Sequence, residues 1–161
     1  MTVGLARAFG MALLLVTFPL VPTVLAESAS LTLTGAVPGG SVTLTDEQLA
    51  ALPQHEMTEQ PTSFPEPMKF KGPLLADVLK LAGATGSDLL AFAADDYKVE
   101  ISGKDIADHG PILALEKNGV RMPPDDFGPY FVMWPFKEKP EIDNEAYQAK
   151  AIWQVVKIEV K

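Results

Sequence analysis

Apolar and polar positions alternate along much of the chain and predict a series of short strands. Residues 31–35 (LTLTG) and 41–45 (SVTLT) flank a turn rich in glycine, which predicts an opening hairpin. A strand, a turn at Asp95–Asp96 and a second strand are predicted within 89–102. Between 112 and 122, Asn118-Gly119 predicts a two-residue hairpin turn, because both central positions need positive φ angles.

The last segment predicts a closing strand over residues 152–160 (IWQVVKIEV). Its expected apolar face consists of Ile152, Val156, Ile158 and Val160, and its polar face of Lys157 and Glu159. Residues 55–70 are expected to be extended, because three prolines in that stretch disfavour a helix.

Two to four short helices are predicted between these strands. Thr45 and Gln48 have the spacing of a capping box at the start of the first. The clearest helix spans residues 72–84, with Pro73 in its first turn and Gly83 at its end. Ser102 leads a helical turn, and Asp143 is the expected cap of the last. The pattern indicates a single α+β domain with mixed or mostly antiparallel sheets and a few short helices.

The first 26 residues predict a secretory signal peptide instead of a part of the fold. They combine Arg7, an apolar run and the small-residue ending PTVLA, with cleavage expected after Ala26. The apolar run is shorter than the roughly 20 residues of a membrane-spanning helix and contains Pro19 and Pro22. The expected mature domain is 27–161, exported to the periplasm.

The charge and the amino-acid composition exclude several classes of function. Without Arg7, the 13 Lys and Arg become 12 against 21 Asp and Glu, so the mature chain carries a net charge of −9. Such a surface repels nucleic acid, which is therefore not an expected partner. The chain has no cysteine, which excludes thiol catalysis and thiolate metal ligands.

No catalytic constellation stands out among the remaining residues. His55 and His109 lie far apart, and a metal site would require the fold to join them to carboxylates. Asp125 and Asp126 are either a general acid and base or a solvated turn after two prolines. Neither a serine nucleophile elbow nor a phosphate-binding loop is present in the sequence.

Five short motifs, in order, resemble the molybdopterin-binding domain of the sulfite oxidase family over roughly residues 31–161. They are a G-x-x-L-x-x-L-L helix, an A-x-D-G-Y turn, a strand ending in NG, a G-P-x-R-x-V-x-P segment and a final W-x-x-x-I-x-V strand. Here they fall at Gly72–Leu79, Ala93–Tyr97, Ala114–Gly119, Gly128–Pro135 and Trp153–Val160, the last with one more residue between Trp153 and Ile158 than the family motif has.

The departures from this family concern its metal chemistry. The enzymes bind molybdenum through one cysteine in the stretch before the first motif. In the corresponding stretch of this chain, residues 55–67, Met57 has the only sulfur. A thioether is a poor substitute for a thiolate on a high-valent metal. The arginine of the fourth motif is also absent, since YFVMWPF follows Gly128-Pro129. No molybdenum is therefore expected.

The chain is most similar to short, cysteine-free, periplasmic members of this family that bind a pterin. That resemblance implies a non-catalytic regulator, which acts on the periplasmic domain of an inner-membrane enzyme that makes or degrades cyclic di-GMP. Two alternatives stay open. One is a molybdopterin-dependent oxidoreductase subunit, and the other is a ligand-free protein-interaction module on the same fold.

A pterin needs an aromatic wall and a carboxylate that accepts its adjacent N–H donors. Trp134 and Tyr130 are the predicted wall, on one face of the strand GPYFVMWPF, with Phe131 and Met133 in the core. Pro135 suggests that this strand ends at an open edge. The candidate polar ligands lie in AADDY and are Asp95, Asp96 and Tyr97. The second candidates, Glu141 and Asp143, lie in a segment that could cover the pocket as a lid.

Overall fold

Three hydrogen-bonded sheets and four short α-helices form the part of the chain that the structure describes. The computed structural model describes Met1, residues 29–62 and residues 64–161. The predicted signal peptide and its cleavage after Ala26 therefore lie outside the described residues.

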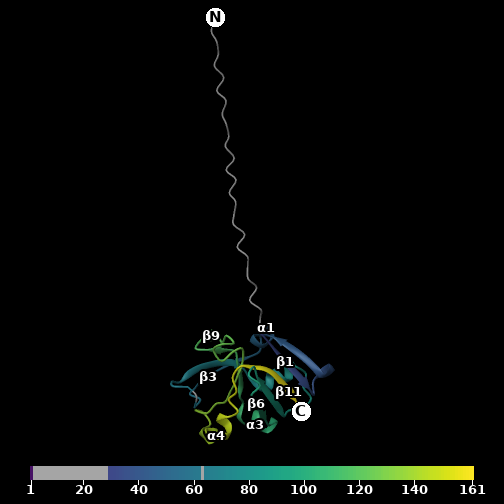
Figure 1. Ribbon diagram of the computed structural model, residues 1–161, viewed down its shortest axis with the longest axis vertical. Helices are drawn as coiled ribbons and strands as arrows, with labels where there is room; N and C mark the ends of the chain where they lie inside the picture. Colours follow the sequence, from purple (N-terminus) through teal and green to yellow (C-terminus); the bar gives the residue numbers. More distant parts are fainter. Residues whose placement is uncertain (2–28, 63) are drawn as a thin grey trace.

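The largest sheet has five strands in the order β2-β1-β11-β5-β6. These strands are β1 (Ser30–Gly35), β2 (Ser41–Thr45), β5 (Leu89–Ala93), β6 (Lys98–Ile101) and β11 (Val155–Val160). β1 and β11 are parallel, and the other neighbours are antiparallel. The predicted hairpins β1–β2 and β5–β6 are thus confirmed, and the last strand of the chain lies between them (Figure 1).

The other two sheets are smaller. The four-stranded sheet has the order β3-β4-β8-β9 and the two-stranded sheet pairs β10 with β7. The strands are β3 (Gln54–Glu59), β4 (Met68–Pro73), β7 (Ile112–Ala114), β8 (Glu116–Lys117), β9 (Val120–Arg121) and β10 (Phe131–Met133). Asn118 and Gly119 have φ angles of 52° and 80°, which confirms the predicted turn between β8 and β9.

The helices are short, and two of the predicted caps are present. They are α1 (Asp46–Ala50), α2 (Leu75–Leu81), α3 (Gly103–His109) and α4 (Glu145–Gln148), with 3-10 turns η1 (Pro38–Gly40) and η2 (Pro140–Ile142). Thr45 and Gln48 form the predicted capping box of α1, and the Ser102 hydroxyl accepts the Asp105 N–H at the start of α3.

Two predicted helix starts are wrong. Pro73 is the last residue of β4, and α2 begins two residues later at Leu75. Asn144 caps α4 in place of Asp143, with its side chain accepting the N–H groups of Ala146 and Tyr147. A capping residue needs an extended backbone. The backbone of Asp143 is not extended, because its N–H donates to the Pro140 carbonyl and closes η2. Either residue type favours a cap, so the sequence did not separate them.

The predicted apolar face of the last strand is wrong at one position. A bulge between Val155 and Lys157 shifts the register, so Val155 is buried and Val156 is 37% exposed. Ile152, Ile158 and Val160 are buried as predicted. The alternation of apolar and polar residues does not reveal a bulge. One extra residue in the strand moves every side chain before it to the opposite face of the sheet.

One buried apolar cluster unites the three sheets, as expected for a single α+β domain with mostly antiparallel sheets. It takes Leu31 and Leu33 from β1, Leu75 and Val78 from α2, and Ile158 from β11. Helices α3 and α4 lie side by side at one end of the domain, away from α1 and β9 (Figure 1). Among the described residues, no helix is long and apolar enough to cross a membrane.

Candidate functional site

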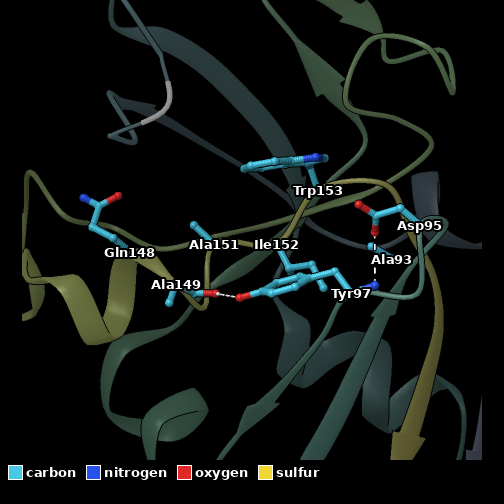
Figure 2. Close-up of a pocket in the computed structure, with 8 residues that line it drawn as sticks. All are labelled: Ala93, Asp95, Tyr97, Gln148, Ala149, Ala151, Ile152 and Trp153. Atoms are coloured by element: carbon cyan, nitrogen blue, oxygen red, sulfur yellow. Dashed lines mark hydrogen bonds between the residues drawn. The ribbon is translucent and has the colours of Figure 1, made fainter.

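A pocket of about 300 Å³ opens where the β5–β6 turn meets the segment before β11. It is lined by Ala93, Asp95, Tyr97, Gln148, Ala149, Ala151, Ile152 and Trp153. These residues come from two stretches, 93–97 and 148–153, that are far apart in the sequence and face one another across the pocket (Figure 2).

Sheet pairing brings the two stretches together. Val155 pairs with Ala93 across β11 and β5, and the Ala94 N–H donates to the Gln154 carbonyl at 3.0 Å. The residues that precede β11 must therefore lie beside the turn that follows β5. Asp96 takes a φ of 66° in this turn, a conformation that aspartate tolerates better than most residues.

Two aromatic rings lie on opposite sides of the pocket. Figure 2 shows the Trp153 indole on one side and the Tyr97 phenol on the other, both nearly edge-on, with an open space between them. Phe127 and Phe131 contact the Trp153 ring at near right angles, with centroids 5.9 and 6.0 Å away, and hold it from the core side. Tyr97 is 49% exposed and its hydroxyl donates to the Ala149 carbonyl at 3.2 Å.

The polar groups of the pocket lie at its ends. Asp95 Oδ1 accepts the Tyr97 N–H at 3.1 Å, and its other carboxylate oxygen points toward the space between the rings (Figure 2). Gln148 lies on the far side. Its amide is held in place, because Oε1 accepts the Thr62 N–H at 3.2 Å and Nε2 donates to Asp143 at 2.7 Å. Asp95 is therefore the carboxylate among the residues that line the pocket.

The predicted polar residues divide around this site. Asp95 and Tyr97 line the pocket, whereas Asp96 is exposed in the same turn and lies outside the lining. Glu141 and Asp143 are exposed and also lie outside the lining. The segment predicted as a lid, residues 138–147, lies outside the lining and leads directly into residues 148–151, which form one wall of the pocket.

The predicted aromatic wall is wrong, because Trp134 and Tyr130 have no exposed surface. Phe131 and Met133 are buried as predicted, so both faces of β10 are in the core. The Trp134 indole N–H donates to the Lys150 carbonyl at 3.1 Å. The Tyr130 hydroxyl lies 3.5 Å from Asp46, and burial raises its pKa.

Pro135 suggested an open strand end, and β10 does end before it, at Met133. The strand end is nevertheless buried at Trp134, whose ring packs against Tyr147 with centroids 5.3 Å apart. We call residues 137–151 the strap. It is fixed at its start by Glu59, whose buried carboxylate accepts the Lys137 N–H at 3.0 Å.

Sequence reasoning missed Trp153 as a wall of the site. The sequence pointed to Trp153 only as the first residue of the fifth motif described above, immediately before the final strand. The pairing of β11 with β5 places it beside Asp95 and Tyr97, and that pairing is not visible in the strand pattern alone.

The remaining chemical candidates do not form a metal centre. Over residues 29–62 and 64–161, no group of three or more His, Asp or Glu side chains is arranged to hold a metal ion. His55 lies in β3, and His109 ends α3 with Nε2 3.3 Å from the Tyr147 hydroxyl. Asp125 and Asp126 form an exposed turn, in which Asp126 pairs with Lys117 at 2.5 Å.

Comparison with protein-family models finds no matching family, and comparison with curated proteins finds no match.

Proposed function

We propose that this protein binds an unconjugated pterin between Trp153 and Tyr97 and does so without catalysis. The observation that carries the proposal is a pair of aromatic rings on opposite sides of a pocket, with a carboxylate at one end (Figure 2). A flat bicyclic ring gains by stacking on aromatic faces, and apolar pockets with a few placed polar groups are typical of small-ligand sites.

Asp95 is the proposed acceptor for the amino-pyrimidine edge of the pterin. That edge offers two adjacent N–H donors, which one carboxylate accepts in a two-pronged contact. Oδ1 already accepts the Tyr97 N–H, but each carboxylate oxygen has two acceptor positions, so the backbone contact orients the group without saturating it. The open edge of the pocket is then left for the substituent of the pterin ring.

Pocket size favours a small ring system over a larger cofactor. About 300 Å³ is at the lower end of the range of ligand sites, which suits a single bicyclic ring with a short side chain. Molybdopterin adds a dithiolene, a phosphate and a metal that requires a thiolate, and this chain has no cysteine. The residues present therefore fit a free pterin and do not fit a molybdenum centre.

The resemblance to the sulfite oxidase family supports the same ligand. Asp95 and Tyr97 belong to its A-x-D-G-Y motif, and Trp153 begins its final W-x-x-x-I-x-V motif, so two separate motifs meet in one pocket. On this resemblance we assign the chain a sulfite oxidase-like molybdopterin-domain fold. We also assign it a role as a periplasmic regulator of an inner-membrane enzyme of cyclic di-GMP metabolism.

Native mass spectrometry of the protein, purified gently from a bacterial periplasm, tests this proposal. The expected result is a bound mass in the pterin range that is lost on denaturation, together with isothermal titration that shows saturable binding of biopterin or tetrahydrobiopterin. Molybdenum in stoichiometric amount would overturn it in favour of an oxidoreductase. A bare protein that also fails to bind both probes would overturn it in favour of a docking module.

A further inference from the structure

One carboxylate outside the pocket ties the pocket wall formed by residues 148–151 to helix α3. Asp105 lies in the first turn of α3, and each of its carboxylate oxygens holds a different residue of the strap. Oδ1 accepts the Tyr147 hydroxyl at 2.8 Å, and Oδ2 accepts the Lys150 ammonium at 2.7 Å. The Asp105 and Lys150 side chains are 18% and 22% exposed, so water screens this pair only partly.

Lys150 is held at both of its ends. Its ammonium group pairs with Asp105 and lies 4.5 Å from the centre of the Tyr147 ring. Its backbone carbonyl accepts the indole N–H of Trp134, which is fully buried. We call Asp105, Tyr147, Lys150 and Trp134 the clasp. It ties the strap to both α3 and the core.

The clasp lies directly behind the pocket. Lys150 stands between Ala149 and Ala151, and both of these residues line the pocket. The Ala149 carbonyl also accepts the Tyr97 hydroxyl, so a shift of the wall moves the ring on the opposite side. Helix α4 spans four residues, which is too short to be stable without tertiary contacts.

Asp105 is ionised throughout the physiological range. Burial raises the pKa of its carboxyl group, but hydrogen bonds from Lys150, Tyr147 and Ser102 outweigh burial and bring the pKa to about 2. The neighbouring groups include Asp108 and His109 on the same helix, and His109 also contacts the Tyr147 hydroxyl. The Asp105 carboxylate therefore stays charged at neutral pH.

We infer that Asp105 is a positioning residue for the ligand pocket, which fixes the spacing between the Trp153 and Tyr97 rings without touching the ligand. This inference rests on the proposed function only for the identity of the ligand. The attachment of the wall to α3 is a property of the protein itself, and it can be measured without any ligand.

The test compares Asp105→Asn with Asp108→Asn, a matched control on the same helix. The Asp108 side chain pairs with Lys104 at the surface. Its backbone carbonyl accepts the ammonium group of Lys139 in the strap, and this contact is kept when only the side chain is changed. Hydrogen exchange is measured by mass spectrometry on the unliganded variants. We expect faster exchange of the Ala149, Ala151 and Ile152 amides in Asp105→Asn, unchanged exchange in β1 and β11, and no change in Asp108→Asn. Biopterin binding should weaken about tenfold in Asp105→Asn alone.

A second variant distinguishes loss of the clasp from a general folding defect. Lys150→Met keeps the apolar stem and the backbone carbonyl and removes only the ammonium group. If both variants act through the clasp, the double variant should bind biopterin no more weakly than the weaker of the two single variants. Additive losses would contradict a shared mechanism and overturn the inference.

The two proposals fail in different ways. If the wild-type protein binds no pterin but Asp105→Asn still loosens residues 149–152, the pterin proposal fails and the positioning role stands. If the wild type binds biopterin and Asp105→Asn matches Asp108→Asn in exchange and affinity, the positioning role is overturned and the pterin proposal stands.

Discussion

The two tryptophans of this chain occupy contrasting environments, although both lie in aromatic surroundings. Trp134 is fully buried, and its indole N–H bonds the strap from inside the core. Trp153 is half-buried, with Phe127 and Phe131 against it and its remaining surface facing a pocket. The comparison shows that the tryptophan within the dense aromatic segment, Trp134, lies in the core, whereas the more isolated Trp153 lines the pocket.

The largest expected effect concerns the core. Trp134→Ala should lower the free energy of unfolding by about 3–5 kcal/mol, because it leaves a cavity and removes the donor to the Lys150 carbonyl. Urea denaturation of the variant and the wild type measures this difference. A loss below about 1 kcal/mol would mean that Trp134 is not part of the core, and the contrast between the tryptophans would disappear.

The matching change in the pocket should act on binding. Trp153→Ala should weaken biopterin binding more than tenfold, a loss of about 1.4 kcal/mol or more, because it removes one stacking face. Its free energy of unfolding should fall less than that of Trp134→Ala, since the ring is only half-buried. Titration calorimetry measures the affinity, and Trp153→Phe, which keeps an aromatic face, should retain part of it. Equal affinity in Trp153→Ala and the wild type would rule out this ring as a wall.

A smaller change distinguishes the two aspartates of one turn. Asp95→Asn should weaken biopterin binding about five- to tenfold, because a neutral amide cannot accept two N–H groups from the ligand. Asp96→Asn is the matched control and should bind like the wild type, since Asp96 lies outside the lining and asparagine tolerates its positive φ. The reverse order of affinities would move the recognition site to Asp96.

The smallest expected effect concerns Glu59, the buried carboxyl beneath the strap. Burial raises its pKa above the usual 4.5, although the hydrogen bond from the Lys137 N–H lowers it in part. The folded state then holds this proton more tightly than the unfolded state, so its contribution to stability decreases as pH rises from about 4.5 through the raised pKa.

Glu59→Gln should therefore gain stability relative to the wild type as pH increases through that window. Urea denaturation of both proteins at pH 4 and pH 7 measures this difference. A Glu59→Gln variant that loses stability relative to the wild type between pH 4 and pH 7 would contradict the raised pKa.

Much of the fold could be predicted from local patterns. The hairpins at 31–45 and 116–121 and the caps at Thr45 and Ser102 depend on neighbouring residues alone, and the structure confirms them. The errors arise where a non-local feature decides. The bulge that turns Val156 outward depends on the register against β5, and the cap at Asn144 depends on the preceding turn η2.

The candidate site was only half predictable for the same reason. Asp95 and Tyr97 lie in a local turn that can be predicted from its own residues, and both line the pocket. Trp153 reaches the site through sheet pairing, and Trp134 leaves it because the strap covers the end of β10. The apolar residues of a strand do not show whether a segment distant in the sequence will cover one of the strand's ends.

One measurement tests the central claim most directly. The chain contains two tryptophans, so the proton–nitrogen NMR spectrum of the protein should contain two indole N–H signals, which Trp153→Phe assigns. On titration with biopterin we expect the Trp153 signal to shift and saturate, because a stacked ring changes its local field, while the Trp134 signal stays nearly fixed in the core. A spectrum in which Trp153 is unmoved at saturating biopterin, or in which only Trp134 shifts, would contradict a pterin site between Trp153 and Tyr97.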